Sequence, residues 1–167
     1  MRLEKATFAQ LTEILAIIAS ARAFLARQKL DQWQNAYPAR ADILADLETG
    51  VGYVLVGADR KIWGYCALLI GEDAHYTAIT DGNWTNDSKN YVTIHRLALS
   101  ENARGKGVGK LFFKAIFETM ADENQHDFRI DTHADNAPMN ALIVSTGFKK
   151  RGIVQFEGAR IAYQKEI

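Results

Sequence analysis

Tyr91-Val92-Thr93-Ile94-His95-Arg96-Leu97-Ala98-Leu99 is followed, four residues later, by Arg104-Gly105-Lys106-Gly107-Val108-Gly109, and these two segments decide the fold. The first is apolar and β-branched at its start, which predicts a strand. Apolar residues spaced four apart over 111–120 predict a helix that begins near Gly109. Glycines at alternate positions leave the backbone N–H groups between strand and helix open to a ligand. Because the first N–H groups of a helix lack partners and carry partial positive charge, the turn is a candidate phosphate or pyrophosphate site.

The cations of this turn strengthen the prediction of an anion site. Arg104, Lys106 and Lys110 can add positive charge, and arginine can form paired hydrogen bonds to phosphate oxygens. The segment lacks the Gly-Lys-Ser/Thr ending of a P-loop and the Gly-x-Gly-x-x-Gly spacing of a dinucleotide fold. On spacing alone, a glycine-rich turn with solvated cations remains the alternative.

Length and composition indicate one folded domain over residues 1–167. The chain is 48% apolar and 10% aromatic, which excludes a disordered chain, and no repeat or linker interrupts it. Twenty basic residues balance twenty acidic ones, which argues against a nucleic-acid partner. With one cysteine and four scattered histidines, we expect no disulfide and no metal site. The charged start and the short apolar runs predict a cytoplasmic protein without a membrane partner.

Hydrophobic periodicity predicts a strand, two helices, a meander of strands, and then strand, helix, strand, helix and two final strands. We expect strands over 2–7, 52–56, 62–70, 91–99, 128–132, 148–156 and 160–164, and a short one over 75–79. We expect helices over 8–28, with Thr7 and Gln10 as a capping box, and over 39–48, 111–120 and 138–145. This order predicts an α+β or mixed α/β domain.

The two segments quoted first resemble the GNAT N-acetyltransferases. In that family an apolar strand precedes a pyrophosphate loop of the form Arg/Gln-x-x-Gly-x-Gly/Ala, as Ile94–Ser100 precedes Arg104–Gly109 here. The family motif Asn-x-x-Ala-x-x-Leu-Tyr-x-x-x-Gly-Phe is similar to a second set of residues, Asn136, Met139, Leu142 and Gly147-Phe148. The resemblance covers nearly the whole chain. It implies a central, mostly antiparallel sheet of six to seven strands, splayed in the middle and flanked by about four helices.

The resemblance also implies acetyl-CoA as cosubstrate and an N-acetyltransferase activity. The backbone of the strand end would meet the pantetheine arm, the loop amides would bind the pyrophosphate, and the Asn136 side chain would contact the pantetheine or thioester. The implied cofactor residues are Leu97, Ala98, Leu99, Arg104, Gly105, Lys106, Gly107, Val108, Gly109, Lys110 and Asn136. An acceptor amine would attack the thioester directly while both substrates are bound.

The sequence departs from the family pattern at the groups that move protons. Ile143 stands where many relatives have a proton-donating tyrosine, so either Tyr163 or Ser145 replaces it or the thiolate leaves without a dedicated acid. Thr93 stands where many relatives have a glutamate base. His95 lies two residues further on the same strand face and is our candidate base, although a histidine held structurally in the sheet is the alternative.

The acceptor is the least determined part of the prediction. Small amines, amino-acid derivatives and protein N-termini or lysines are all compatible with the sequence, and we expect a small-molecule primary amine. Its pocket would be walled by Trp33, Tyr37, Tyr76 and Trp84, with Glu72, Asp73, Asp81 or Asp87 attracting its charge. Core packing of these aromatic residues and solvation of these acids are the alternatives. A non-catalytic acyl-CoA-binding sensor on the same fold is the competing function, and a homodimer through the last strands is compatible with the sequence.

Overall fold

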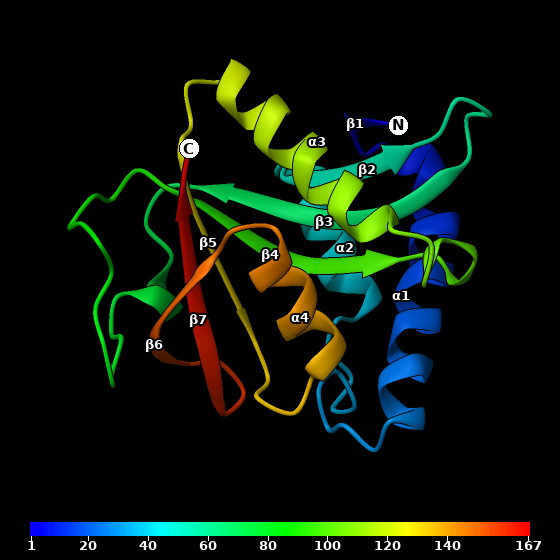
Figure 1. The fold of residues 1–167 in the computed structure, drawn as a ribbon. Coiled ribbons are helices and arrows are strands. Elements are labelled where there is room, and N and C mark those ends of the chain that lie inside the picture. Colours follow the sequence, from blue (N-terminus) through cyan, green and yellow to red (C-terminus); the bar gives the residue numbers. More distant parts are fainter. The chain divides into compact units, whose positions relative to one another are not determined.

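The computed structural model describes residues 1–167, which form strands and helices (Figure 1). The strands are β1 (Arg2–Lys5), β2 (Gly52–Val56), β3 (Ile62–Ile70), β4 (Val92–Leu99), β5 (Asp127–Thr132), β6 (Lys149–Gln155) and β7 (Ala159–Glu166). The helices are α1 (Leu11–Arg27), α2 (Arg40–Glu48), α3 (Val108–Asp122) and α4 (Ala137–Ser145), and the short 3-10 turns are η1 (Phe8–Gln10), η2 (Ala74–Tyr76) and η3 (Glu101–Ala103).

The strands form one sheet in the order β1-β2-β3-β4-β5-β7-β6. The pairs β1–β2, β2–β3, β5–β7 and β6–β7 are antiparallel, whereas β4 and β5 run parallel through Val92–Phe128 and Thr93–Arg129. The predicted mixed α/β fold, with a mostly antiparallel seven-stranded sheet and four helices, is therefore confirmed.

One predicted element is wrong. Residues 75–79 form no strand, because the Asp73 side chain accepts a hydrogen bond from the His75 N–H and stabilises a 3-10 turn at this point. The next residue, Thr80, makes an isolated antiparallel bridge to Ile153 of β6. The Thr7–Gln10 pair lies as expected, with the Thr7 N–H donating to Gln10 Oε1 at 2.9 Å.

The chain divides into two compact units, each built from two segments. Unit 1 comprises residues 1–68 and 95–116, and unit 2 comprises residues 69–94 and 117–167. The boundaries between the units fall inside β3, β4 and α3 rather than in linkers.

The core of unit 1 is formed by α1, α2 and the inner faces of β2 and β3. Ile14, Ile43 and Tyr65 are fully buried there, together with other residues of one apolar cluster. By length and composition, Phe8–Arg27 could cross a membrane. Its residues at helical spacing pack into this cluster: Leu11, Ile14, Ile17, Ile18, Ala21 and Leu25.

In unit 2, the segment between β3 and β4 is tied to the C-terminal strands. Thr80 exchanges two backbone hydrogen bonds with Ile153, of 2.9 and 2.8 Å, and the Thr85 N–H donates to the Gln164 side chain at 2.8 Å. Tyr76, Tyr91, Val154 and Ala162 form a buried cluster beneath this segment. The long connection over residues 71–90 is therefore an ordered part of unit 2.

Candidate functional site

The glycine-rich turn lies between β4 and α3, as the sequence predicts, and its residues 104–109 belong to unit 1. Gly105 and Gly107 have left-handed backbone conformations, with φ of +72° and +75°, which glycine adopts without strain. A Cβ at either position would meet nothing within 4 Å, so the space beside them is open. Gly105, Lys106 and Gly107 are exposed, whereas Val108 and Gly109, where α3 begins, are buried. The turn thus presents backbone and a cationic side chain to an incoming anion.

Arg104 is engaged with the protein rather than extended towards solvent. Its Nη2 donates to Ser20 Oγ at 2.9 Å and to the Leu99 carbonyl at 3.1 Å. The guanidinium also lies 5.0 Å from the centre of the Phe24 ring. Burial, with a further contribution from Arg27, lowers the pKa of Arg104. Arg104 therefore joins the turn to α1, and Lys106 and Lys110 are the exposed cations of the segment.

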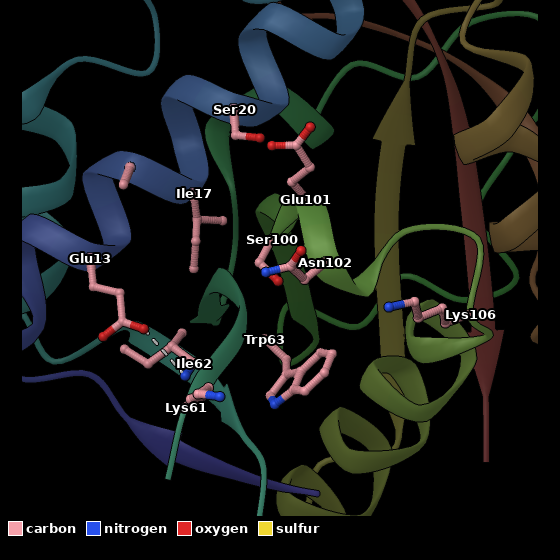
Figure 2. Close-up of a pocket in the computed structure, with 11 residues that line it drawn as sticks. Glu13, Ile17, Ser20, Lys61, Ile62, Trp63, Ser100, Glu101, Asn102 and Lys106 are labelled. Carbon is pink, nitrogen blue, oxygen red and sulfur yellow. Dashed lines mark hydrogen bonds between the residues drawn. The ribbon is translucent and has the colours of Figure 1, made fainter. Parts of the chain in front are cut away.

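A pocket of about 530 Å³ opens beside the turn within unit 1 (Figure 2). Ser20 and Ile17 reach it from α1, and Trp63 reaches it from the start of β3. Lys106 brings the glycine-rich turn to its edge. The rest of its lining comes from α1, from the start of β3 and from η3 with the residue before it: Glu13, Ala16, Lys61, Ile62, Ser100, Glu101 and Asn102. Acidic and basic side chains both line it, so the pocket by itself selects no charge.

The last residues of β4 differ in burial. Leu97 and Ala98 are buried, whereas His95, Arg96 and Leu99 are partly exposed. Arg96 has a φ of +54°, a left-handed conformation that is uncommon inside a strand for a residue with a Cβ. The structure places the candidate base His95 directly before this interruption of the strand. Its role in proton transfer stays a prediction.

Sequence reasoning missed the partner of Arg96. Arg96 Nε donates to Asp46 Oδ2 at 2.8 Å and Nη2 donates to Asp46 Oδ1 at 2.5 Å, while Nη1 donates to the Tyr37 hydroxyl at 2.7 Å. Asp46 lies on α2, fifty positions earlier in the chain. No local pattern signals a contact over that distance, because an acidic residue on a helix is usually solvated.

The two aromatic residues predicted for the acceptor site in unit 1 lie in different surroundings. Trp33 is buried in the apolar cluster of unit 1 and has a φ of +65°. Tyr37 is partly exposed and holds Arg96 through its hydroxyl. Burial raises the pKa of Tyr37, so it remains protonated at neutral pH. Tyr37 is therefore the better placed of the two to meet a ligand.

In unit 2, Asn136 caps α4. Its Oδ1 accepts a hydrogen bond from the Met139 N–H at 3.2 Å, and its side chain is buried. The next turn of α4 carries Asn140, whose Nδ2 donates to the carbonyl oxygens of His133, Ala134 and Asn136. The loop between β5 and α4 is thus fixed by two asparagines, one of them the residue that the family motif singles out.

The two candidate proton donors, Tyr163 and Ser145, also lie in unit 2. Ile143, which stands in the place of the family tyrosine, is fully buried. The Tyr163 hydroxyl donates to Asn140 Oδ1 at 2.7 Å, and burial raises the pKa of Tyr163. Ser145 Oγ donates to the Leu142 carbonyl one turn back along α4, at 2.8 Å. Both hydroxyl protons are therefore engaged within the protein.

Tyr76 and Trp84 form a stacked pair in unit 2, with ring centres 5.4 Å apart. The Tyr76 hydroxyl donates to Asp131 at 2.7 Å, and Trp84 Nε1 donates to the Tyr76 carbonyl at 2.9 Å. Tyr76 is 1% exposed, so Trp84 and not Tyr76 carries the accessible surface of the pair. Among the acids predicted to attract an amine, Asp73 is buried, whereas Glu72, Asp81 and Asp87 are exposed.

Comparison with known proteins agrees with this geometry. A family model described as acetyltransferase (GNAT) family matches residues 18–148. A GNAT-family acetyltransferase from Streptococcus agalactiae 2603 is 34% identical, with a TM-score of 0.93 over 99% of this chain and 95% of its own.

More distant solved structures share the fold. A GNAT-family acetyltransferase from Listeria monocytogenes 4b F2365 is 17% identical, with a TM-score of 0.77 over 99% of this chain and 94% of its own. The PaiA N-acetyltransferase from Thermoplasma acidophilum, in complex with coenzyme A, is 16% identical, with a TM-score of 0.70 over 99% and 98%. No curated protein matches the chain. The family match and the Streptococcus structure, together with the turn between β4 and α3, show that the chain belongs to the GNAT acetyltransferase family.

Proposed function

We propose that this protein moves the acetyl group of acetyl-CoA to a primary amine, and that the amine is a small molecule. The observation that carries the proposal is the exposed turn of Gly105 and Gly107, in left-handed conformation and in open space at the start of α3. A diphosphate fits there, because the amides can approach it without a Cβ between and Lys106 adds charge. The coenzyme A complex of the Thermoplasma neighbour supports the same class of ligand.

For unit 1, we propose that the amides of 104–109 hold the pyrophosphate and that the backbone of Leu97 and Leu99 meets the pantetheine arm. The Asn136 side chain stays a predicted contact of the pantetheine. The proposal assigns Lys106 and Lys110 a charge contribution and Arg104 a structural one, since two of the Arg104 hydrogen bonds are made to protein oxygens.

The chemistry we propose is direct transfer. The amine nitrogen attacks the thioester carbonyl carbon, a C–N bond forms, the C–S bond breaks, and the sulfur leaves as a thiolate. The amine must lose a proton, which we assign to His95 directly or through water. Ile143 has no proton to donate, and the hydroxyl of Tyr163 is engaged with Asn140. We therefore propose that the thiolate leaves without a dedicated acid, which the modest basicity of a thiolate allows.

For the acceptor, we propose that Tyr37 and Trp84 contribute accessible aromatic surface. Trp33 and Tyr76 would support them from the buried clusters of their units. We also propose that the protein works in the cytoplasm. A homodimer through the last strands would have to use β6, because β7 lies between β5 and β6, and Thr80 already occupies part of the β6 edge.

Calorimetry with CoA and acetyl-CoA, followed by a panel of amines assayed by thiol release, tests the proposal. We expect both ligands to bind with dissociation constants in the micromolar range, and at least one small amine to release thiol. Heat of binding without turnover on any amine would instead favour an acyl-CoA-binding sensor. The absence of heat with either ligand would overturn the site itself.

A further inference from the structure

Arg96 has a left-handed backbone conformation inside β4, directly before Leu97, whose backbone the proposed function places against the pantetheine arm. Its φ of +54° is unfavourable for a residue with a Cβ, and such a conformation persists where the surroundings hold it in place. The chain uses arginine there rather than glycine, which would adopt the conformation without strain. The contacts of the Arg96 side chain therefore explain why an arginine occupies this position.

The Arg96 guanidinium donates to a carboxylate, that of Asp46, which also accepts a hydrogen bond from β3. Asp46 on α2 accepts both Arg96 Nε and Nη2, at 2.8 and 2.5 Å, and also accepts the Tyr65 hydroxyl of β3 at 2.6 Å. The exposed fractions of the Arg96 and Asp46 side chains are 13% and 5%. A paired arginine–carboxylate contact fixes direction as well as distance, because both groups are planar. These paired bonds hold the left-handed residue of β4 to α2, and we call them the Arg96–Asp46 clamp.

The remaining nitrogen of Arg96 reaches the loop that precedes α2. Nη1 donates to the Tyr37 hydroxyl at 2.7 Å, and the guanidinium lies 5.9 Å from the centre of the Tyr37 ring. The same loop is held to α1 by Arg22, whose Nη2 donates to the Pro38 carbonyl. Tyr37 is the partly exposed aromatic residue that we propose for the acceptor site. The Arg96 guanidinium thus contacts both Asp46 of α2 and Tyr37 in the loop before α2.

We propose that Arg96 is a positioning residue. Through its paired bonds to Asp46 and its bond to the Tyr37 hydroxyl, it fixes the position of β4 relative to Tyr37. This inference rests on the proposed acetyl transfer. Arg96 touches no reacting atom in it. Because near-attack geometry controls the rate of a two-substrate transfer, loosening the clamp lowers turnover more than it lowers cofactor affinity.

Three variants test the role of Arg96. Arg96→Lys keeps the positive charge but cannot form the paired contact. Tyr37→Phe removes only the hydroxyl that accepts a hydrogen bond from Arg96 Nη1. Tyr65→Phe removes a hydrogen bond to the Asp46 carboxylate and leaves both bonds between Arg96 and Asp46 in place. Each is assayed for melting temperature, acetyl-CoA dissociation constant by calorimetry, and kcat and KM by thiol release with the amine that the wild type acetylates fastest.

We expect Arg96→Lys to lower kcat tenfold or more while the acetyl-CoA dissociation constant changes less than threefold. We expect Tyr37→Phe to raise the KM for the amine at least threefold with an unchanged acetyl-CoA dissociation constant. Tyr65→Phe should lower the melting temperature and leave kcat within twofold. This split separates positioning from a merely structural contribution.

The inference is overturned if Arg96→Lys keeps kcat within twofold, or if kcat falls with melting temperature alike in Arg96→Lys and Tyr65→Phe. Should Arg96→Lys fail to fold, Tyr37→Phe decides, and an unchanged amine KM in that variant overturns the inference. A wild-type protein that releases no thiol would overturn the proposed transfer itself. Wild-type activity with unaffected variants would overturn only the role of Arg96.

Discussion

The Arg104 guanidinium donates a hydrogen bond of 2.9 Å to the hydroxyl of Ser20 and so fastens the glycine-rich turn to α1. The same nitrogen donates to the Leu99 carbonyl at the end of β4. An arginine that grips a phosphate uses its N–H groups on phosphate oxygens. Here two hydrogen bonds go to the protein, which leaves the exposed charge of the turn on Lys106 and Lys110.

Because Arg104 bonds to the protein and Lys106 is exposed, we expect Ser20→Ala to affect stability and Lys106→Ala to affect CoA affinity. Ser20→Ala should lower the free energy of unfolding by about 1 kcal/mol, the usual net value of one hydrogen bond. It should change the CoA dissociation constant less than twofold. Lys106→Ala should leave stability unchanged and weaken CoA binding three- to tenfold at low salt, with a smaller effect at high salt. Denaturant unfolding and calorimetry measure the two quantities, and a reversed pattern would contradict the assignment.

Gly107 has a matched control elsewhere in unit 1. Gly50 has a φ of +72° against +75° at Gly107, and a Cβ would meet nothing within 4 Å at either position. Alanine should therefore cost each site a similar 1–2 kcal/mol of stability, roughly the penalty of the left-handed conformation. We expect only Gly107→Ala to weaken CoA binding, by tenfold or more. Equal CoA affinity in the two variants would rule out the turn as the diphosphate site.

Gly64 of β3 packs against Phe112 of α3 with no room for a side chain. A Cβ there would lie 2.6 Å from a ring carbon of Phe112 and 2.9 Å from the Ala98 carbonyl oxygen. Because Phe112 is fully buried and the carbonyl belongs to β4, neither can move aside cheaply. Gly64→Ala should cost about 2–3 kcal/mol, as overpacked cores do. Urea denaturation checks this, and Phe112→Leu should restore only part of the loss because the carbonyl remains.

Cys66 should be silent in the thiol-release assay. Its side chain is fully buried, and burial, followed by the negative charge of Asp46, raises the pKa of its thiol. We expect no reaction of the folded protein with Ellman's reagent at pH 8, and one thiol per chain after denaturation. A rapid reaction in the folded state would contradict the packing of β3.

The same shift in pKa predicts a pH dependence of stability. Above about pH 9 the thiol of the unfolded chain ionises, whereas the buried thiol stays protonated. The unfolded state then binds fewer protons, so the free energy of unfolding falls as pH rises. Cys66→Ala should show a shallower decline between about pH 9 and 10. Parallel slopes for the two proteins in denaturant titrations would exclude the thiol as a cause.

His95→Gln tests the proposed base. Glutamine keeps a polar side chain of similar size but cannot accept the proton of an ammonium at neutral pH. We expect kcat to fall ten- to a hundredfold. The CoA dissociation constant should stay unchanged. A normal turnover would leave His95 a structural residue of β4.

Local sequence patterns predicted most of the helices and strands and the glycine-rich turn, because these depend on neighbouring residues. Apolar spacing located β2, β3 and α1 to within a few residues, and alternate glycines located the turn before α3. It failed at residues 75–79, where the Asp73 side chain stabilises a 3-10 turn instead of the predicted strand.

Only the tertiary structure decided which side chains of the candidate site work together. It joined Arg96 to Asp46, fifty positions away, and Arg104 to Ser20, eighty-four positions away. Such pairs leave no periodic trace in a sequence, since the partner of a charge is selected by the packing of α1 and α2 against the sheet. A hydrogen bond depends on positions in space, and distant residues acquire those only when the core has formed.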